Sequence, residues 1–144
     1  MEKEIFIVRL KKGKAKMYKE IIVCIIVIAL IFSIDLISNN YTKKVFGEMN
    51  EILGNLRNEM IKEEENSKIN EEIRRLEKKW NENFKTLSFY IEHNELEKVA
   101  KQITLIKGNA DVKEYSQAIP QLDECVFLLN HIKDKESLLI RNLF

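Results

Sequence analysis

His93 and His131 are the side chains of this 144-residue chain best suited to carry protons near neutral pH. Together with Glu95 or Glu97 and with Asp134, they form the candidate set for a metal site. Neither histidine belongs to a Glu-x-x-His or His-Glu-x-x-His motif, so these ligands would meet only through the tertiary fold. Both lie near predicted helix C-termini, where the helix dipole stabilises an imidazolium ion. We therefore interpret them as structural, and expect no catalytic residue, no metal and no cofactor.

Four aromatic residues, Trp80, Phe84, Phe89 and Tyr90, are a second candidate site, for binding a ligand or a partner. Trp80 and Phe84 follow a helical apolar spacing, which is far more typical of a hydrophobic core. Phe89 and Tyr90 lie partly off that stripe and are better candidates for an exposed contact patch. The predicted partner-contact residues are Phe89, Tyr90, His93, His131, Leu143 and Phe144.

The elements that would position these residues begin with an apolar run of 17 residues, Ile21–Ile37. As a helix it would rise about 26 Å at about 1.5 Å per residue, close to the roughly 30 Å of bilayer hydrocarbon. The run is apolar on all faces except at Asp35, near one end. Tyr18 and Tyr41 flank it, as residues of the membrane interface do. We predict a transmembrane anchor over residues 21–37.

Charge is distributed unevenly around this run. Residues 1–20 hold seven Lys or Arg against three acids, whereas the part after residue 37 holds 17 against 19. The positive-inside rule therefore predicts a cytoplasmic leader at 1–20 and an extracytoplasmic domain at 38–144, in a single-pass protein of the cell membrane. A basic cluster in the leader is expected to hold anionic lipid headgroups; its members are Lys11, Lys12, Lys14, Lys16 and Lys19.

Two other interpretations of the run remain open. A cleaved signal peptide is disfavoured because no A-x-A-like site follows the apolar residues. A buried core helix is the other alternative. Cys24 would lie in the membrane segment and Cys125 in the outer domain, so no disulfide between them is expected.

The outer domain is predicted to be all-α. Glycine and proline are rare there, and apolar residues recur every three or four positions. Four stripes follow one another: Val45 to Met60, Ile69 to Ile91, Leu96 to Ile106, and Val112 to Ile132. Short links require consecutive helices to run antiparallel. The expected fold is thus a transmembrane helix that continues into an up-and-down bundle of three to four helices. The heptad-like spacing also suits a coiled-coil dimer.

Capping signals predict where the last helices begin and end. Asn94 and Glu97 match a capping box, and Gly108 suits a left-handed C-terminal residue, which gives a third helix of about 13 residues. Pro120 is expected to bend the fourth helix or to begin a new one. The fourth helix, of about 22 residues by its period, then overhangs the third. We expect residues 138–144 to fold against the base of the first two helices or to touch the membrane.

Several segments resemble domain of unknown function family 4363, short bacterial proteins with an N-terminal membrane segment and a helical remainder. They are Lys79-Trp80, Phe84, Leu87-Ser88, Ile91-Glu92-His93, Leu128-Leu129-Asn130-His131-Ile132 and Asn142-Leu143-Phe144. The resemblance covers roughly residues 20–144 and implies an anchor and a helical domain but no activity. The chain departs from the family pattern at Lys133, where members often have proline, and in its longer leader.

The sequence favours a non-enzymatic scaffold or adaptor of the cell envelope that contacts another envelope protein or itself. The alternative is a small-molecule-sensing bundle coupled to its membrane helix, and an enzyme ranks third. Nucleic-acid binding is disfavoured because acids match the basic residues of the outer domain. Phosphate-binding glycine motifs, zinc-finger spacings and nucleophile elbows are also absent from the sequence.

Overall fold

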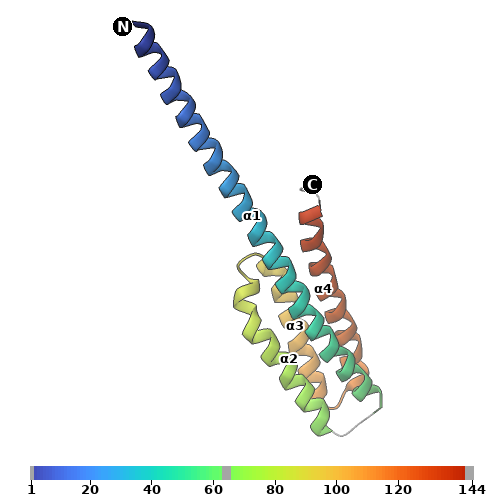
Figure 1. Ribbon diagram of the computed structural model, residues 1–144. Helices are drawn as coiled ribbons and strands as arrows, with labels where there is room; N and C mark the ends of the chain where they lie inside the picture. The colour runs from blue at the N-terminus through green and yellow to red at the C-terminus, as the bar shows by residue number, and fades with distance from the viewer. Residues whose placement is uncertain (1, 63–65, 142–144) are drawn as a thin grey trace. The chain divides into compact units, whose positions relative to one another are not determined.

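A computed structural model describes the backbone of residues 2–62 and 66–141. Over these residues the chain forms four α-helices and no strand (Figure 1). They are α1 (Glu2–Ile61), α2 (Asn66–Leu87), α3 (His93–Asp111) and α4 (Tyr115–Arg141). The predicted all-α class, with a long apolar N-terminal helix that leads into a helical bundle, is confirmed.

The chain divides into two units, Met1–Ile37 and Ser38–Phe144, and α1 belongs to both. In the first unit, α1 is long and apolar enough to cross a membrane, and its most apolar window is not buried. A signal sequence near an N-terminus meets the same criteria of length and composition.

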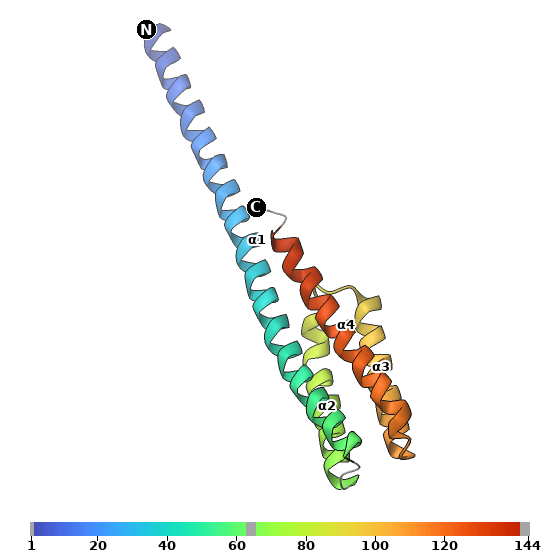
Figure 2. The same ribbon diagram turned by 90° about the vertical axis from the view of Figure 1, so that its right-hand side faces the viewer.

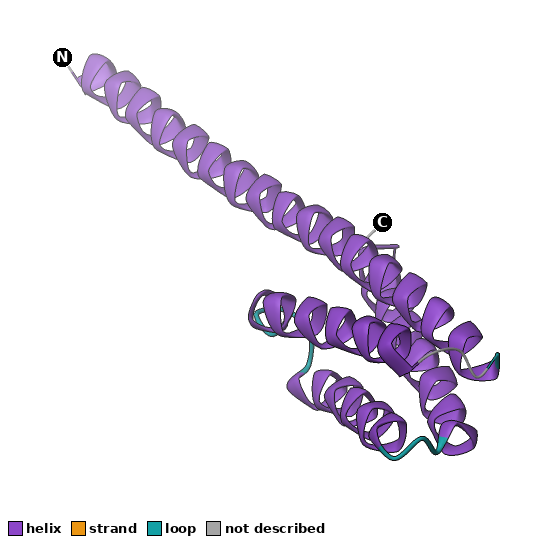
Figure 3. Cartoon of the chain, turned by 90° about the horizontal axis from the view of Figure 1, so that it is seen from below, coloured by secondary structure: helices purple, strands orange, loops and turns teal. Residues whose placement is uncertain are grey.

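The second unit is an antiparallel helical bundle (Figure 2). Polar side-chain contacts join its neighbouring helices. The Lys107 ammonium lies 2.9 Å from the Glu77 carboxylate and joins α3 to α2. α4 contacts α1 through an ion pair in which Arg57 Nε lies 3.0 Å from Asp123 Oδ1. Figure 3, seen from below, shows that the described residues of the bundle are helical apart from the short connections. Lys79 pairs with Glu48 and joins α2 to α1, and Lys135 pairs with Glu95 and joins α4 to α3, so the four helices close a ring in the order α1, α2, α3, α4.

The core is formed by one apolar face from each helix. Fully buried side chains come from all four: Phe46, Met49, Leu53, Leu56, Met60, Ile69, Leu76, Leu87, Leu96, Ile106, Leu122 and Leu129. The predicted stripes of α1, α2 and α3 all face this core. Trp80 is buried and Phe84 packs against it edge-on, with ring centroids 5.5 Å apart. Trp80 belongs to the core, as the spacing predicted, and Phe84 is partly buried against it.

The inner face of α4 differs from the predicted stripe. Its buried residues are Ala118, Leu122, Cys125, Leu129 and Ile132. Ile119 and Val126 are only partly buried, and Val112 is exposed because it precedes the helix. The small side chains of Ala118 and Cys125 face the core in place of the predicted Ile119 and Val126. The buried face of α4 is therefore rotated relative to the predicted stripe.

The ends of α3 were predicted wrongly. The helix begins at His93 with Glu92 as its cap residue and no side-chain cap, so the Asn94–Glu97 capping box does not form. It also continues through Gly108 to Asp111, and the left-handed residue is Lys113, with φ 63°. A Cβ atom added at Gly108 would meet no neighbouring atom, so packing does not require a glycine at this position.

α4 is one helix from Tyr115 to Arg141, with Pro120 inside it, so the proline does not begin a separate helix. α4 has 27 residues and α3 has 19, both longer than predicted. The overhang remains about 12 Å at about 1.5 Å per residue. At this end the Ser137 hydroxyl donates to the Asn39 amide oxygen at 3.2 Å, which places α4 beside α1.

Candidate functional site

A polar cluster lies at the end of the bundle where its part of α1 begins. The Tyr41 hydroxyl donates to the Asn83 amide oxygen at 2.6 Å, and the hydroxyls of Thr42 and Tyr90 lie 2.9 Å apart. Thr42 is fully buried, and burial raises the pKa of the Tyr90 phenol above its ordinary value. These bonds tie the end of α2 and the turn after it to α1. This cluster was not predicted from the sequence, where its only signal is a threonine one turn before the apolar stripe of α1.

Phe89 and Tyr90 were predicted to form one exposed contact patch. Both lie in the α2–α3 turn, but their side chains differ in burial. Phe89 is 79% exposed, whereas Tyr90 packs against the core and bonds to Thr42. Leu87 and Ile91, on either side, are both buried. The expectation of an exposed Tyr90 is therefore not met, because its hydroxyl finds a partner on α1. Phe89 stays a candidate contact residue.

The two histidines lie in different surroundings, and neither is near a helix C-terminus. His93 is the first residue of α3, where an imidazolium ion would meet the positive end of the helix dipole. Its Nε2 lies 3.1 Å from a Glu97 carboxylate oxygen. His131 lies inside α4 and stacks on the exposed Phe127 ring, with centroids 6.0 Å apart. The predicted C-terminal positions were wrong because α3 begins earlier and α4 ends later than the periodicity suggested.

The candidate metal ligands do not converge. In the part of the chain whose side chains are described, no group of three or more His, Cys, Asp or Glu residues could hold a metal ion. Glu95 instead accepts from Lys135 at 2.9 Å, and Lys135 also reaches Glu92 at 3.0 Å. Hydrogen bonds to Glu95 and then Glu92 raise the pKa of the Lys135 ammonium. These residues thus join α4 to the start of α3.

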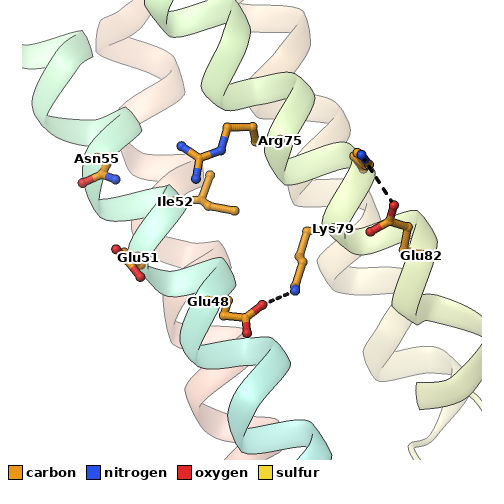
Figure 4. Close-up of a pocket in the computed structure, with 8 residues that line it drawn as sticks. Glu48, Glu51, Ile52, Asn55, Arg75, Lys79 and Glu82 are labelled. Carbon is orange, nitrogen blue, oxygen red and sulfur yellow. Dashed lines mark ion pairs between the residues drawn. The ribbon is translucent and has the colours of Figure 1, made fainter.

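A surface groove of about 400 Å³ lies between α1 and α2 (Figure 4). Its lining residues are Glu48, Glu51, Ile52, Asn55, Arg75, Lys78, Lys79 and Glu82. Lys79 pairs with Glu48, and Lys78 lies 3.8 Å from Glu82. The hydrogen bond from Lys79 lowers the pKa of the Glu48 carboxyl. The eight residues carry three charges of each sign and include no histidine, cysteine or hydroxyl nucleophile, so the groove has no evident catalytic chemistry.

Several predicted residues have no described side chains. Lys11, Lys12, Lys14 and Lys16 are among them, while Lys19 is described and exposed. Leu143 and Phe144 lie outside the described residues, as do the side chains of Leu138, Leu139 and Ile140. The predicted contact between the C-terminal tail and the bilayer thus remains a prediction.

The geometry defines a class of protein: a small helical bundle that continues from an apolar helix and whose described side chains form no group of three or more potential metal ligands. The chain belongs to the family described as Domain of unknown function (DUF4363), whose model matches residues 36–143. The match covers the bundle and begins at the end of the apolar run. A search of curated proteins and a search of solved structures each found no match.

Proposed function

We propose that this protein is a single-pass membrane protein whose helical bundle acts as a non-enzymatic scaffold or adaptor of the cell envelope. Residues 1–20 would lie in the cytoplasm and residues 38–144 on the other side of the membrane. The observation that carries the proposal is an unburied apolar segment of α1 that is continuous with one helix of a packed bundle. A helix apolar on every face is stable in lipid and costly in water.

The composition of the core favours an adaptor over the small-molecule sensor. A sensor needs a cavity with polar groups that orient a ligand. Among the described side chains, Thr42 and Gln102 are the buried polar residues, and the rest of the core is apolar. Thr42 is already bonded to Tyr90, and the groove between α1 and α2 is an open surface in which Lys79 pairs with Glu48 and Lys78 with Glu82.

Exposed apolar residues supply the surfaces on which a partner could dock. Phe127, Leu105 and Val112 are large apolar side chains that the bundle leaves exposed. Phe127 is stacked on His131, which restrains both rings. Rigid, exposed aromatic residues are typical of protein interaction sites because they bury much area at low entropic cost.

Two experiments test the proposal. Protease added to spheroplasts should degrade the bundle and leave a protected fragment of the leader and apolar run; a fully protected chain would overturn the topology.

For the adaptor role, a photo-crosslinking amino acid is placed at Phe127, Leu105 or Val112, with exposed Glu71 as the polar control. We expect discrete adducts from at least one apolar position and none from Glu71. Co-expression of two differently tagged copies distinguishes self-association from binding of a second protein. If none of the three apolar positions gives an adduct, the adaptor proposal is contradicted.

A further inference from the structure

We infer that the turn between α2 and α3 contacts the bilayer surface and inserts Phe89 among the lipids. This inference rests on the proposed membrane anchor and adds a second membrane contact, made by the bundle itself. We call Ser88–Ile91 the Phe89 turn. Its position, its side chains and its backbone each support the inference.

Three hydrogen bonds place the Phe89 turn at the end of the bundle where its part of α1 begins. The Thr42–Tyr90 bond ties the turn itself to α1. The Tyr41–Asn83 and Ser137–Asn39 bonds hold the end of α2 and the overhang of α4 at the same level. Figure 1 shows the α2–α3 connection and the C-terminal end of α4 at this end of the bundle. Thr42 follows Ile37, the last residue of the apolar run, by only five residues, or about 7.5 Å of helix.

The side chains of the turn suit the interface between lipid and water. Phe89 is 79% exposed, although Leu87 and Ile91 anchor the turn in the core. The six residues from Thr86 to Ile91 carry no charge, so their transfer from water desolvates no ion. Exposed lysines lie nearby in the chain, Lys85 before the turn and Lys43 and Lys44 after Thr42, where they can meet anionic headgroups.

The backbone of the turn can leave water without leaving donors unpaired. The amide of Ser88 donates to Phe84 at 2.9 Å, and that of Phe89 to Thr86 at 3.3 Å. Tyr90 and Ile91 both donate to the carbonyl of Leu87, at 3.2 and 2.9 Å. Unpaired backbone N–H and C=O groups both make a loop unfavourable in an apolar phase, and pairing the N–H groups removes that part of the cost. All four amides of the Phe89 turn have protein acceptors, which an ordinary solvent-exposed loop does not need.

Phe127 provides a matched control, because it is 65% exposed but lies on α4 away from the end of the bundle that holds the Phe89 turn. Across the α1–α4 seam, Asn130 meets Asn50 and Asp123 meets Arg57, so Phe127 lies at a level between these contacts. Asn50 follows Ile37 by 13 residues, which is about 20 Å of helix. Lipid near the Phe89 turn should not reach Phe127.

The test uses the full chain in nanodiscs of phosphatidylcholine and phosphatidylglycerol, with or without bromine on the acyl chains. The parent protein contains only Trp80, which is buried and sets the baseline emission. The variants Phe89→Trp and Phe127→Trp each add one tryptophan at an exposed position. We expect the added emission of Phe89→Trp to be shifted to the blue in both kinds of nanodisc and to be quenched by brominated lipid, whereas that of Phe127→Trp stays unquenched. Circular dichroism of both variants checks that the helices are intact.

The outcomes separate this inference from the proposed anchor. If the chain stays in the nanodisc after alkaline carbonate treatment but aqueous iodide, and not bromolipid, quenches Phe89→Trp, the inference is wrong and the anchor stands. In that case Phe89 is free for a protein partner. Equal bromolipid quenching of both variants would also overturn the inference, because the bundle would then lie along the membrane. Release of the chain by carbonate would instead refute the anchor.

Discussion

The Asn50 side-chain amide donates to the Asn130 amide oxygen at 3.1 Å, which joins α1 to α4 across 80 residues of sequence. Lys133 donates to the same oxygen at 3.0 Å. Seven residues later in α1 and seven residues earlier in α4, Arg57 meets Asp123 at 3.0 Å. The seven-residue interval is two helical turns, so the two contacts lie on one seam and fix the register of the antiparallel pair.

The first prediction concerns this seam. Asn50→Ala should lower the free energy of unfolding by about 1 kcal/mol, the usual net value of one hydrogen bond. Asn130→Ala should cost more because it also removes the acceptor of Lys133. A double-mutant cycle, followed by the fluorescence of Trp80 during denaturation, should give a coupling of about 0.5–1.5 kcal/mol. Additive single effects would show that the bond contributes nothing to stability.

The second prediction tests the core. Leu76 on α2 is fully buried, and Leu76→Ala should lower the free energy of unfolding by about 2–5 kcal/mol through lost burial and the cavity left behind. Leu105 on α3 is 38% exposed, so the same truncation there should cost less than about 1.5 kcal/mol. Thermal unfolding followed by circular dichroism measures both. Similar losses at the two positions would contradict the described packing.

The third prediction concerns Cys125, whose thiol pKa is raised by burial to about 12. In a Cys24→Ser background, maleimide at pH 8 should not label the native protein and should label it after unfolding. The unfolded thiol ionises at the lower, ordinary pKa, so it releases its proton first as the pH rises. The free energy of unfolding should therefore fall between about pH 9 and pH 12 by roughly 1.4 kcal/mol per pH unit. Cys125→Ala should show a shallower dependence on pH, and an identical slope would rule out this origin.

The fourth prediction concerns Lys113, which adopts a left-handed backbone conformation in the α3–α4 connection. A side chain in this conformation costs about 1 kcal/mol, which glycine avoids. Lys113→Gly should therefore raise the midpoint of thermal unfolding, while Lys113→Ala should not. A gain with alanine would instead assign the effect to the lysine side chain.

Much of the fold follows from the helical period alone. Large apolar residues such as Met49, Leu76 and Ile103 recur at three or four positions, and no strand pattern competes with them. The inner face of α4 was harder to predict because Ala118 and Cys125 bury little area and do not mark a stripe. Helix ends were least predictable, since tertiary packing carries α3 through Gly108 despite its C-terminal signal.

The candidate site was less predictable than the fold. The off-stripe position of Phe89 did indicate its exposure. The partnership of Tyr90 with Thr42 depends on how α2 and α1 align, which no local pattern encodes. The errors for His93 and His131 followed directly from the misplaced helix ends.

The hydrogen bond between Ser137 and Asn39 also has a practical consequence for fusion proteins. It places the last turns of α4 beside the first residues of the bundle's part of α1. A reporter fused after α4 would therefore be attached at that end of the bundle. If α1 is anchored there, a bulky reporter would compete with the headgroups for space and could tilt the bundle. An epitope inserted between α1 and α2 would be attached at the opposite end and is the safer choice for labelling the native protein.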